Sequence, residues 1–401
     1  MSKDAVHSFQ GERLAQALDA RRLSQVQLAR MAGVSPATVS KWRAGTHAPS
    51  TDALERLARV INVSAEWFTR PLLAPTSAPM FRSNASAHTA ARAMLGARVQ
   101  WAQDLASALA HYVDWPALNL PDYGFTEPEA ITAEDVERAA AHCRSLWKLG
   151  SAPIADLTLA AEGAGIIVVR EVTGAAQIEG LSAWSSALER PIALLSADKE
   201  NAYRSRFDLA HEIGHIVLHR HIERASERDR YRLLEKQAHY FAGALLLPAE
   251  AIAAQTPDFP TLDDLLPLKR RWGTSVAAII MRLKAIGFLG EDETRALFKR
   301  RSARWGAKAE PGDDQRAPEC PRLLRRAIES IAGAGIMPTS AMPDYTGMRA
   351  GDIESLASLP DGWLLGTIAA PKLVHLKPRT GSAPRNSGGA TIMRFSRTKA
   401  G

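Results

Sequence analysis

The sequence predicts a multi-domain protein in which an all-α domain is followed by an α+β domain with a small sheet. The chain has 401 residues, which is too long for one small hydrophobic core and corresponds to about two to three domains. Its first ~70 residues read as short helices separated by turn signals. Between residues 133 and 288, two helices, three short β-like runs and further helices follow one another, the layout of an α+β domain.

The composition is that of an ordinary globular protein with reduced cysteines. Hydrophobic residues make up 46% of the chain and charged residues 23%. Cys143 and Cys320 lie far apart without C-x-x-C spacing, so we expect neither a disulfide framework nor a cysteine-ligated zinc. The N-terminus lacks an apolar signal segment and no run reaches the ~18 apolar residues of a membrane span, so the cytoplasm is the expected location. A net charge of +7 favours polyanionic partners.

Two short helices near the N-terminus have clear start and stop signals. Ser24 is an N-cap with Gln27 at the capping-box position. Ser35 caps the next helix, Pro36 takes its first position, and Gly45 ends it. We expect the remaining helices of this domain, which spans residues 1–72, near residues 51–60 and 64–69.

A helix, a short turn and a second helix of this size match the helix-turn-helix motif, whose second helix enters the major groove of DNA. Val39 and Trp42 would then face the core. The candidates for base contact are Ser35, Ala37, Thr38 and Lys41, and those for phosphate contact are Gln25, Arg43 and Thr46. On the pattern alone, a helical bundle that binds other proteins is the alternative.

The stretch "LSQVQLARMAGVSPATVSKWRAGTHAPSTDALERLARVINVSAEWF" resembles the lambda-repressor-like, xenobiotic-response-element (XRE) family of helix-turn-helix domains over its full length. The resemblance includes the reading helix "S-x-x-x-V-S-K-W-x-x-G". It implies binding of double-stranded operator DNA. Because members of the family usually bind palindromic operators as dimers, it also implies a homodimer.

Residues 73–130 are expected to form a linker and a spacer helix. The prolines Pro71, Pro75 and Pro79 and scattered small polar residues have the composition of a linker. Helical periodicity then runs from about His88 to Tyr112.

Residues 131–290 are expected to form the α+β domain. Two helices, "AEDVERAAAHCRSLWKLG" and "IADLTLAAEGAG", precede the β-like runs "IIVVREV", "QIEGLSAW" and "PIALLS". Helix returns from about Asn201 and continues, with interruptions, to about Phe288.

The run "RFDLAHEIGHIVLH" contains H-E-x-x-H inside a helix apolar enough to be buried. His211 and His215 share a helix face and can bind one metal ion, while Glu212 is offset by about 100° and can reach a water beside it. Catalytic zinc needs a third ligand, and Glu235 on the next predicted helix is the nearest carboxylate that could turn inward. A helix that merely contains two histidines is the alternative, although buried Glu and His are costly unless coordinated or paired.

This run, with the "EKQAHYFAGALLLP" that follows, is similar to the ImmA/IrrE family of gluzincin-type metallopeptidase domains over roughly residues 135–290. The resemblance implies Zn2+ as cofactor, His211, His215 and Glu235 as its ligands, and Glu212 as general base. The family usually has Asn or Asp where this chain has His239. We expect His239 to orient a ligating histidine, and binding of the metal by His239 itself is the alternative.

Other residues near the motif have weaker assignments. An oxyanion donor is usual in such sites, and the unranked candidates are Tyr203, Tyr231 and Tyr240. His219 and His221 are expected at the surface or as helix caps. Arg206 is expected to support structure through a carboxylate or a neighbouring loop.

The C-terminal part of the chain is less informative. The segment "LKRRWGTSVAAIIMRLKAIGFL" has the pattern of a second DNA-reading pair, but the resemblance implies that it closes the peptidase domain. Residues 291–371 are expected to be helical, without an assigned role. Residues 372–401 carry seven Lys or Arg and no Asp or Glu, which predicts a disordered basic tail.

The combined prediction is a DNA-binding transcriptional regulator that carries a zinc-dependent endopeptidase domain. Members of the ImmA/IrrE family commonly cut a repressor in response to stress or phage-related signals. This implies cleavage of the chain itself or of a partner repressor, with the linker from Pro71 to Pro79 as an accessible target. The alternative is a DNA-binding repressor whose zinc domain is a non-proteolytic sensor or structural module. Glu212 discriminates in principle, because a structural site needs no general base.

Overall fold

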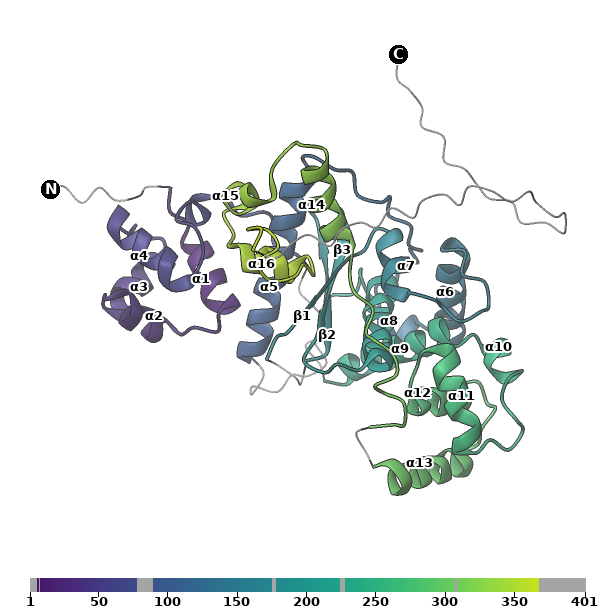
Figure 1. Cartoon of the computed structure of the whole chain (residues 1–401). Coiled ribbons are helices and arrows are strands. Elements are labelled where there is room, and N and C mark those ends of the chain that lie inside the picture. Colours follow the sequence, from purple (N-terminus) through teal and green to yellow (C-terminus); the bar gives the residue numbers. More distant parts are fainter. Residues whose placement is uncertain are drawn as a thin grey trace, which may run out of the picture. The chain divides into compact units, whose positions relative to one another are not determined.

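The computed structural model describes residues 6, 8–77, 89–174, 178–223, 228–306 and 309–367 (Figure 1). These described residues form one compact unit. A helical N-terminal domain precedes a helix-rich domain with a three-stranded sheet, so the predicted fold class is confirmed. No described helix is long and apolar enough to cross a membrane. The basic tail predicted from Lys372 lies outside the described residues.

The N-terminal domain forms through the local signals that its sequence contains. Ser24 and Gln27 make the reciprocal capping box, and the Ser35 hydroxyl accepts a hydrogen bond from the Thr38 N–H. Val39 and Trp42 are buried in the core of this domain. Its helices are α1 (Gly11–Ala20), α2 (Gln25–Ala32), α3 (Pro36–Arg43), α4 (Thr51–Ile61) and the 3-10 helix η1 (Glu66–Thr69).

The sheet has the order β1-β3-β2, so β2 is an edge strand. Its strands are β1 (Ile167–Glu171), β2 (Gly180–Ser185) and β3 (Arg190–Ser196). β1 runs parallel to β3, and β2 runs antiparallel to β3, with Trp184 opposite Pro191.

The two faces of the sheet belong to two different hydrophobic cores, because successive strand residues point to opposite faces. Val169, Leu181 and Leu194 pack with α5 (Thr89–Leu109) and the N-terminal helices. Val168, Ala193 and Leu195 pack on the other face against the helices around the H-E-x-x-H segment. The sheet therefore separates the core that contains the N-terminal domain from the core that contains the H-E-x-x-H helix.

The predicted spacer helix α5 is a central buried element. Trp101 is fully buried, and its ring lies 5.5 Å from that of Trp67. Arg13 of α1 forms an ion pair with Asp104 of α5. α5 thus joins the N-terminal helices to the sheet through packed side chains.

The second core is built mainly by the helices around the H-E-x-x-H segment, of which α8 and α9 lie side by side (Figure 1). These elements are η3 (Pro128–Ala130), α6 (Ala133–Leu146), α7 (Leu157–Gly163), α8 (Ala202–Leu218), α9 (Arg228–Leu246), α10 (Ala249–Ala253), α11 (Leu262–Trp272), α12 (Val276–Ala285) and α13 (Glu291–Trp305).

The last described helices return to the first core. Asp352 of the C-terminal helices binds both Arg21 and Arg98, and Arg98 also pairs with Glu171 of β1. This buried network links four parts of the chain that are far apart in sequence. The helices are α14 (Leu323–Gly333), the 3-10 helix η4 (Thr339–Ala341), α15 (Met342–Thr346) and α16 (Ala350–Leu356).

Candidate metal centre and nucleic-acid interface

Helix α8 brings the H-E-x-x-H residues into the interior. It begins at an Asn201 cap, whose side chain accepts from the Arg204 N–H, and His211, Glu212 and His215 are all buried on it. Arg206 pairs with Glu319 and donates to the Ile154 carbonyl oxygen. Arg206 therefore anchors the helix to neighbouring loops, as its sequence context predicted.

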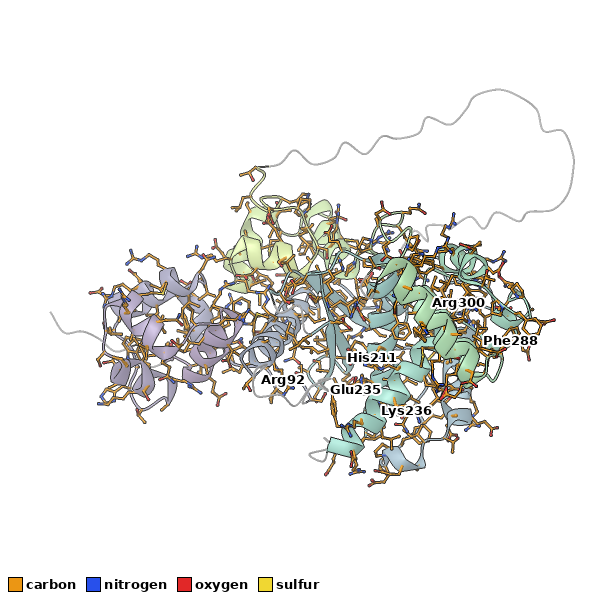
Figure 2. The ribbon with its side chains drawn as sticks, turned by 90° about the horizontal axis from the view of Figure 1, so that it is seen from below. Arg92, His211, Glu235, Lys236, Phe288 and Arg300 are labelled. Atoms are coloured by element: carbon orange, nitrogen blue, oxygen red, sulfur yellow. The ribbon has the colours of Figure 1, made fainter. Side chains whose placement is uncertain are left out.

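Helix α9 brings Glu235 to His211 (Figure 2) and to His215. His211 Nε2 and His215 Nε2 lie 3.1 Å apart. The Glu235 carboxylate oxygens lie 3.5 Å from His211 Nε2 and 3.4 Å from His215 Nε2. Two ligand atoms at ~2.0–2.1 Å from one tetrahedral zinc are separated by roughly 3.3 Å, so these three side chains have the spacing of a zinc site.

The Glu235 carboxylate also has the electrostatics of a metal ligand. Burial alone would raise its pKa, but the neighbouring His215 and a hydrogen bond from Tyr231 hold the pKa below its ordinary value. Its Oε2 atom is buried and has no hydrogen-bond partner among the described residues. A buried carboxylate oxygen is costly unless compensated, and a cation between the carboxylate and the two imidazoles would compensate it. The residues present therefore fit the metal that the sequence implies.

His239, one turn after Glu235, also faces this cluster. Its Nδ1 lies 2.8 Å from the Glu235 carbonyl oxygen. A hydrogen bond there places the proton on Nδ1, so Nε2 carries the lone pair that an acceptor or a metal ligand uses. His211, Glu235 and His239 each offer a ligand atom within 4.8 Å of one another. The geometry thus leaves both of the predicted roles for His239 open.

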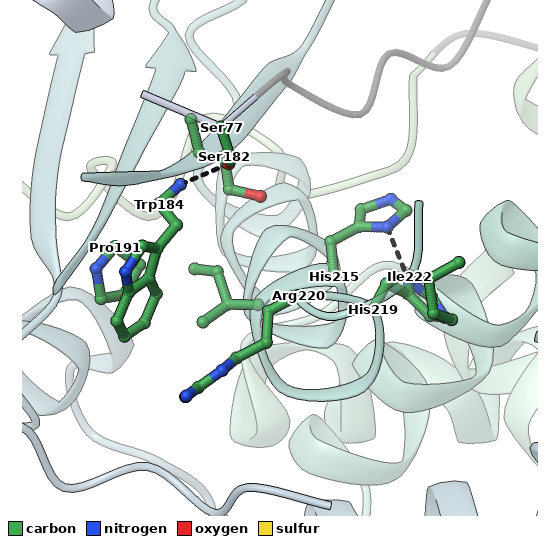
Figure 3. Close-up of a pocket in the computed structure, with 10 residues that line it drawn as sticks. Ser77, Ser182, Trp184, Pro191, His215, His219, Arg220 and Ile222 are labelled. Carbon is green, nitrogen blue, oxygen red and sulfur yellow. Dashed lines mark hydrogen bonds between the residues drawn. The ribbon is translucent and has the colours of Figure 1, made fainter. Parts of the chain in front are cut away.

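A buried chain of side chains orients His215 from behind (Figure 3). The Gln237 amide donates to the Pro128 and Ile131 carbonyl oxygens, so its own oxygen is free to accept from His219 Nε2 at 3.2 Å. His219 Nδ1 then accepts from His215 Nδ1 at 2.9 Å. This relay of His215, His219 and Gln237 leaves the His215 Nε2 lone pair directed at His211 and Glu235.

His219 is the C-cap of α8, which is one of its two predicted places. The other expectation, a place at the surface, is wrong, because its side chain is fully buried. Burial, together with the neighbouring His215, lowers the pKa of His219 well below its ordinary value and keeps the imidazole neutral. A neutral His219 can accept on one nitrogen and donate on the other, as the relay requires. His221 is exposed and binds Asp122, as predicted for a surface residue.

Glu212 is held by a residue that the sequence did not identify. The Ser182 hydroxyl on β2 donates to the Glu212 carboxylate at 2.7 Å. Burial raises the pKa of Glu212 to about 7, and His215 and the Ser182 hydrogen bond oppose this rise. A carboxylate with a pKa near neutrality is well matched to general-base work.

The structure separates the three tyrosine candidates. Tyr231 donates to Glu235 Oε1 at 2.9 Å, so it lies beside the metal-ligand cluster. Tyr203 is buried under the Lys269 ammonium. Tyr240 interacts with Glu137 and Arg282. Only Tyr231 of these three contacts a predicted ligand among the interactions of the described residues.

The proposed DNA-contacting side chains lie along the exposed surface of α2 and α3. Ser35, Ala37, Lys41 and Arg43 are exposed, and Gln25 and Thr38 are half-buried. The exposed surface of α3 and its cap thus presents a hydroxyl, a methyl and an ammonium group to solvent, which suits contact with base edges and phosphates.

The second segment with a DNA-reading pattern is closed to such contact. The Glu310 carboxylate accepts from the Val276 and Ala277 N–H groups at the start of α12. The N-terminus of α12 is therefore already paired with an anion of this chain.

Comparison with protein families identifies both regions. Residues 14–68 match the family model described as helix-turn-helix. Residues 161–284 match the family model described as IrrE N-terminal-like domain. The chain carries both domains. The two predicted resemblances are confirmed over these residues, and the combination supports a DNA-binding regulator that carries a peptidase-family domain. No curated protein matches the chain.

Proposed function

We propose that this protein is a transcriptional regulator that binds operator DNA as a homodimer and contains an active zinc-dependent endopeptidase. Its substrate is the chain itself or a partner repressor, and cleavage answers a stress or phage-related signal. Cutting near Pro71 to Pro79 would separate the DNA-reading helices from the rest of the chain.

His211, His215 and Glu235 would hold the zinc ion. When bound, zinc supplies Lewis acidity that activates water and polarises a peptide carbonyl. The relay through His219 and Gln237 fixes His215 in the tautomer that a ligand needs. The Tyr231 hydroxyl fixes one oxygen of Glu235.

Glu212 would accept and hold the proton that leaves the attacking water. Its pKa of about 7 allows the carboxylate to take this proton and the carboxylic acid to return it to the leaving amine. Ser182 keeps the Glu212 carboxylate in place during both transfers. The buried, Ser182-bound Glu212 is the single observation that carries the proposal, because a structural metal site has no use for such a base.

The test compares the full-length protein with Glu212→Ala and with the exposed control Glu250→Ala. Zinc content and fragments of the chain or of a neighbouring repressor are measured in the presence of operator DNA. We expect zinc in all three proteins and cleavage in wild type and Glu250→Ala only. Zinc in all three with cleavage in none would refute the endopeptidase.

A non-proteolytic zinc sensor is a second candidate, and the position of His239 favours it. With four protein ligands the site would be closed, as structural zinc sites are, and would lack the open position of a catalytic site. X-ray absorption at the zinc edge of the full-length protein counts the imidazole ligands. Two imidazoles fit the endopeptidase and three fit the sensor, and His239→Asn should lower the count only in the second case.

A further inference from the structure

The edge of β2 beside the metal centre is partly occupied by the chain's own linker. The N–H of Ser77 donates to the Trp184 carbonyl oxygen at 2.8 Å, and the Trp184 N–H donates to the Ser77 hydroxyl at 2.8 Å (Figure 3). Both backbone groups of Trp184 therefore point away from β3, toward the outer edge. Residues two apart in a strand share this direction, so the backbone of Ser182 faces the same edge.

Two glutamines of α5 hold the segment that approaches this edge. Gln103, which is fully buried, donates to the Ala74 carbonyl oxygen at 3.0 Å. Gln100 donates to the Thr76 hydroxyl at 2.9 Å. Residues 74–77, called the strap from here on, are thus fixed at three points. Pro75 has no N–H, so the strap pairs with β2 at Ser77 and does not extend the sheet as a regular strand.

The strap stands next to the metal-ligand cluster. Ser77 lines a cavity of about 130 Å³, and its other walls include Trp184, Ile216 and Ile222 together with His215 and His219 of the relay. Ser182, two residues before Trp184 on β2, donates to the Glu212 carboxylate. A peptide that ran along β2 past Glu212 would meet Ser77 at Trp184. The Ser77 side chain is too small to fill this largely apolar cavity.

We propose that the strap is an internal competitor that blocks the β2 edge. An extended peptide with an apolar side chain at the place of Ser77 would pair with the backbone of Trp184 and Ser182 and fill the cavity. Such strand addition derives affinity from main-chain hydrogen bonds and specificity from alternate side-chain pockets. The strap is tethered to the same chain, so it competes at an effective concentration in the millimolar range. Release of residues 74–77 is then required before another peptide binds.

The proposal deepens the proposed function, since it assigns the regulation of the same site, but its test does not depend on cleavage. All proteins are full-length and carry Glu212→Gln. The probe is a fluorescein-labelled peptide that copies residues 71–77 with leucine in the place of Ser77, and its binding is measured by fluorescence anisotropy. Ser77→Pro removes the N–H that pairs with Trp184. Ala74→Pro is the matched control, because it introduces a proline into the same strap but keeps the carbonyl oxygen that accepts from Gln103 and the Ser77 N–H.

We expect Ser77→Pro to bind the probe at least about tenfold more tightly than the Ser77 protein and the Ala74→Pro control, because the tethered competitor is lost. Equal affinity in all three proteins, or no binding to Ser77→Pro, would overturn the proposal. A milder variant, Ser77→Ala, retains the N–H and loses only the hydroxyl. In this variant the amide hydrogen of Trp184 should exchange with solvent faster, and added probe should slow the exchange again. An unchanged exchange rate would count against the strap. Absence of cleavage in the wild-type protein would count against the proposed endopeptidase and would leave these binding results valid.

Discussion

The DNA-reading helices and the metal centre are built in opposite ways. The helices α2 and α3 begin at the hydroxyl caps Ser24 and Ser35, each of which accepts from the N–H three residues later, and five of the seven proposed contact residues are exposed. The metal centre is assembled from β2, α8, α9 and the loop at Pro128, and its working side chains are buried or half-buried. Local capping therefore determines the first region, and long-range pairing of polar groups determines the second.

This difference shows where a substitution should have its effect. A change on the exposed surface of α3 alters DNA binding directly and leaves the core intact. A change in the buried polar groups around α8 alters protonation, metal affinity and stability together, because each group is another group's partner. Four predictions follow from this contrast, in order of decreasing effect.

The largest effect concerns a buried carboxylate outside the metal centre. Burial raises the pKa of Glu162 to about 7, and Asp156 adds to this, while the Leu323 and Arg322 N–H groups and Arg326 oppose it. Because the folded chain holds this proton more tightly than the unfolded chain, stability is greatest below pH 4.5 and falls as the pH rises to about 7.

Glu162→Gln should therefore gain stability relative to wild type by up to about 3 kcal/mol between pH 4.5 and pH 8. The glutamine oxygen can still accept the two N–H bonds that Glu162 Oε1 accepts at the start of α14. Thermal midpoints of both proteins across this pH range measure the difference. If the thermal midpoints of the two proteins changed in parallel with pH, burial would not be what raises the pKa of Glu162.

The next effect concerns the relay behind His215. Gln237→Leu removes the acceptor of His219 and should lower zinc affinity about 10- to 100-fold, as loss of such outer partners does. Competition with a chelator measures the affinity. Gln255→Ala is the control, because the Gln255 amide donates to the carbonyl oxygen of Ala251, four residues earlier, and not to a member of the relay. Unchanged affinity in Gln237→Leu would mean that the relay does not orient the ligand.

The same contrast explains what the sequence could predict. The caps at Ser24 and Ser35 and the H-E-x-x-H spacing are local patterns, so the helices and the candidate ligands His211, His215 and Glu235 followed from them. Ser182 could not be found this way, because it reaches Glu212 only after β2 pairs with β3 and packs beside α8. A serine in a β-like run carries no signal of such a contact.

His219 shows a different limit. A histidine at the end of a predicted helix is usually solvated, and its burial here depends on Gln237, eighteen residues away, and on the carbonyl groups of the Pro128 loop. The i, i+4 spacing from His215 is the one signal that could have placed His219 behind the ligand. The strap is likewise invisible to a local pattern, because proline and small residues predict a linker whatever it packs against.

A comparison of two helix caps distinguishes an effect on stability from an effect on DNA recognition. Ser24→Ala and Ser35→Ala should each cost about 1 kcal/mol of unfolding free energy, because each removes a hydroxyl acceptor at a helix start. Only Ser35→Ala should also weaken operator binding, since Ser35 lies at the proposed base-contacting end of α3. Thermal unfolding and operator titration on both variants make the comparison. Equal losses of operator affinity would mean that Ser35 acts through folding alone.

The smallest effect concerns a single phosphate contact. Arg43 is exposed at the end of α3, and we expect Arg43→Ala to weaken binding to all DNA sequences alike and to reduce the slope of log affinity against log salt concentration by about 1. Arg59→Ala removes the same charge from the exposed surface of α4 and serves as the matched control. If net charge alone attracted DNA, both variants would change the slope equally. A change confined to Arg43→Ala would place α3 against the phosphates, and the contrast with the buried metal centre would then hold for function as well as for structure.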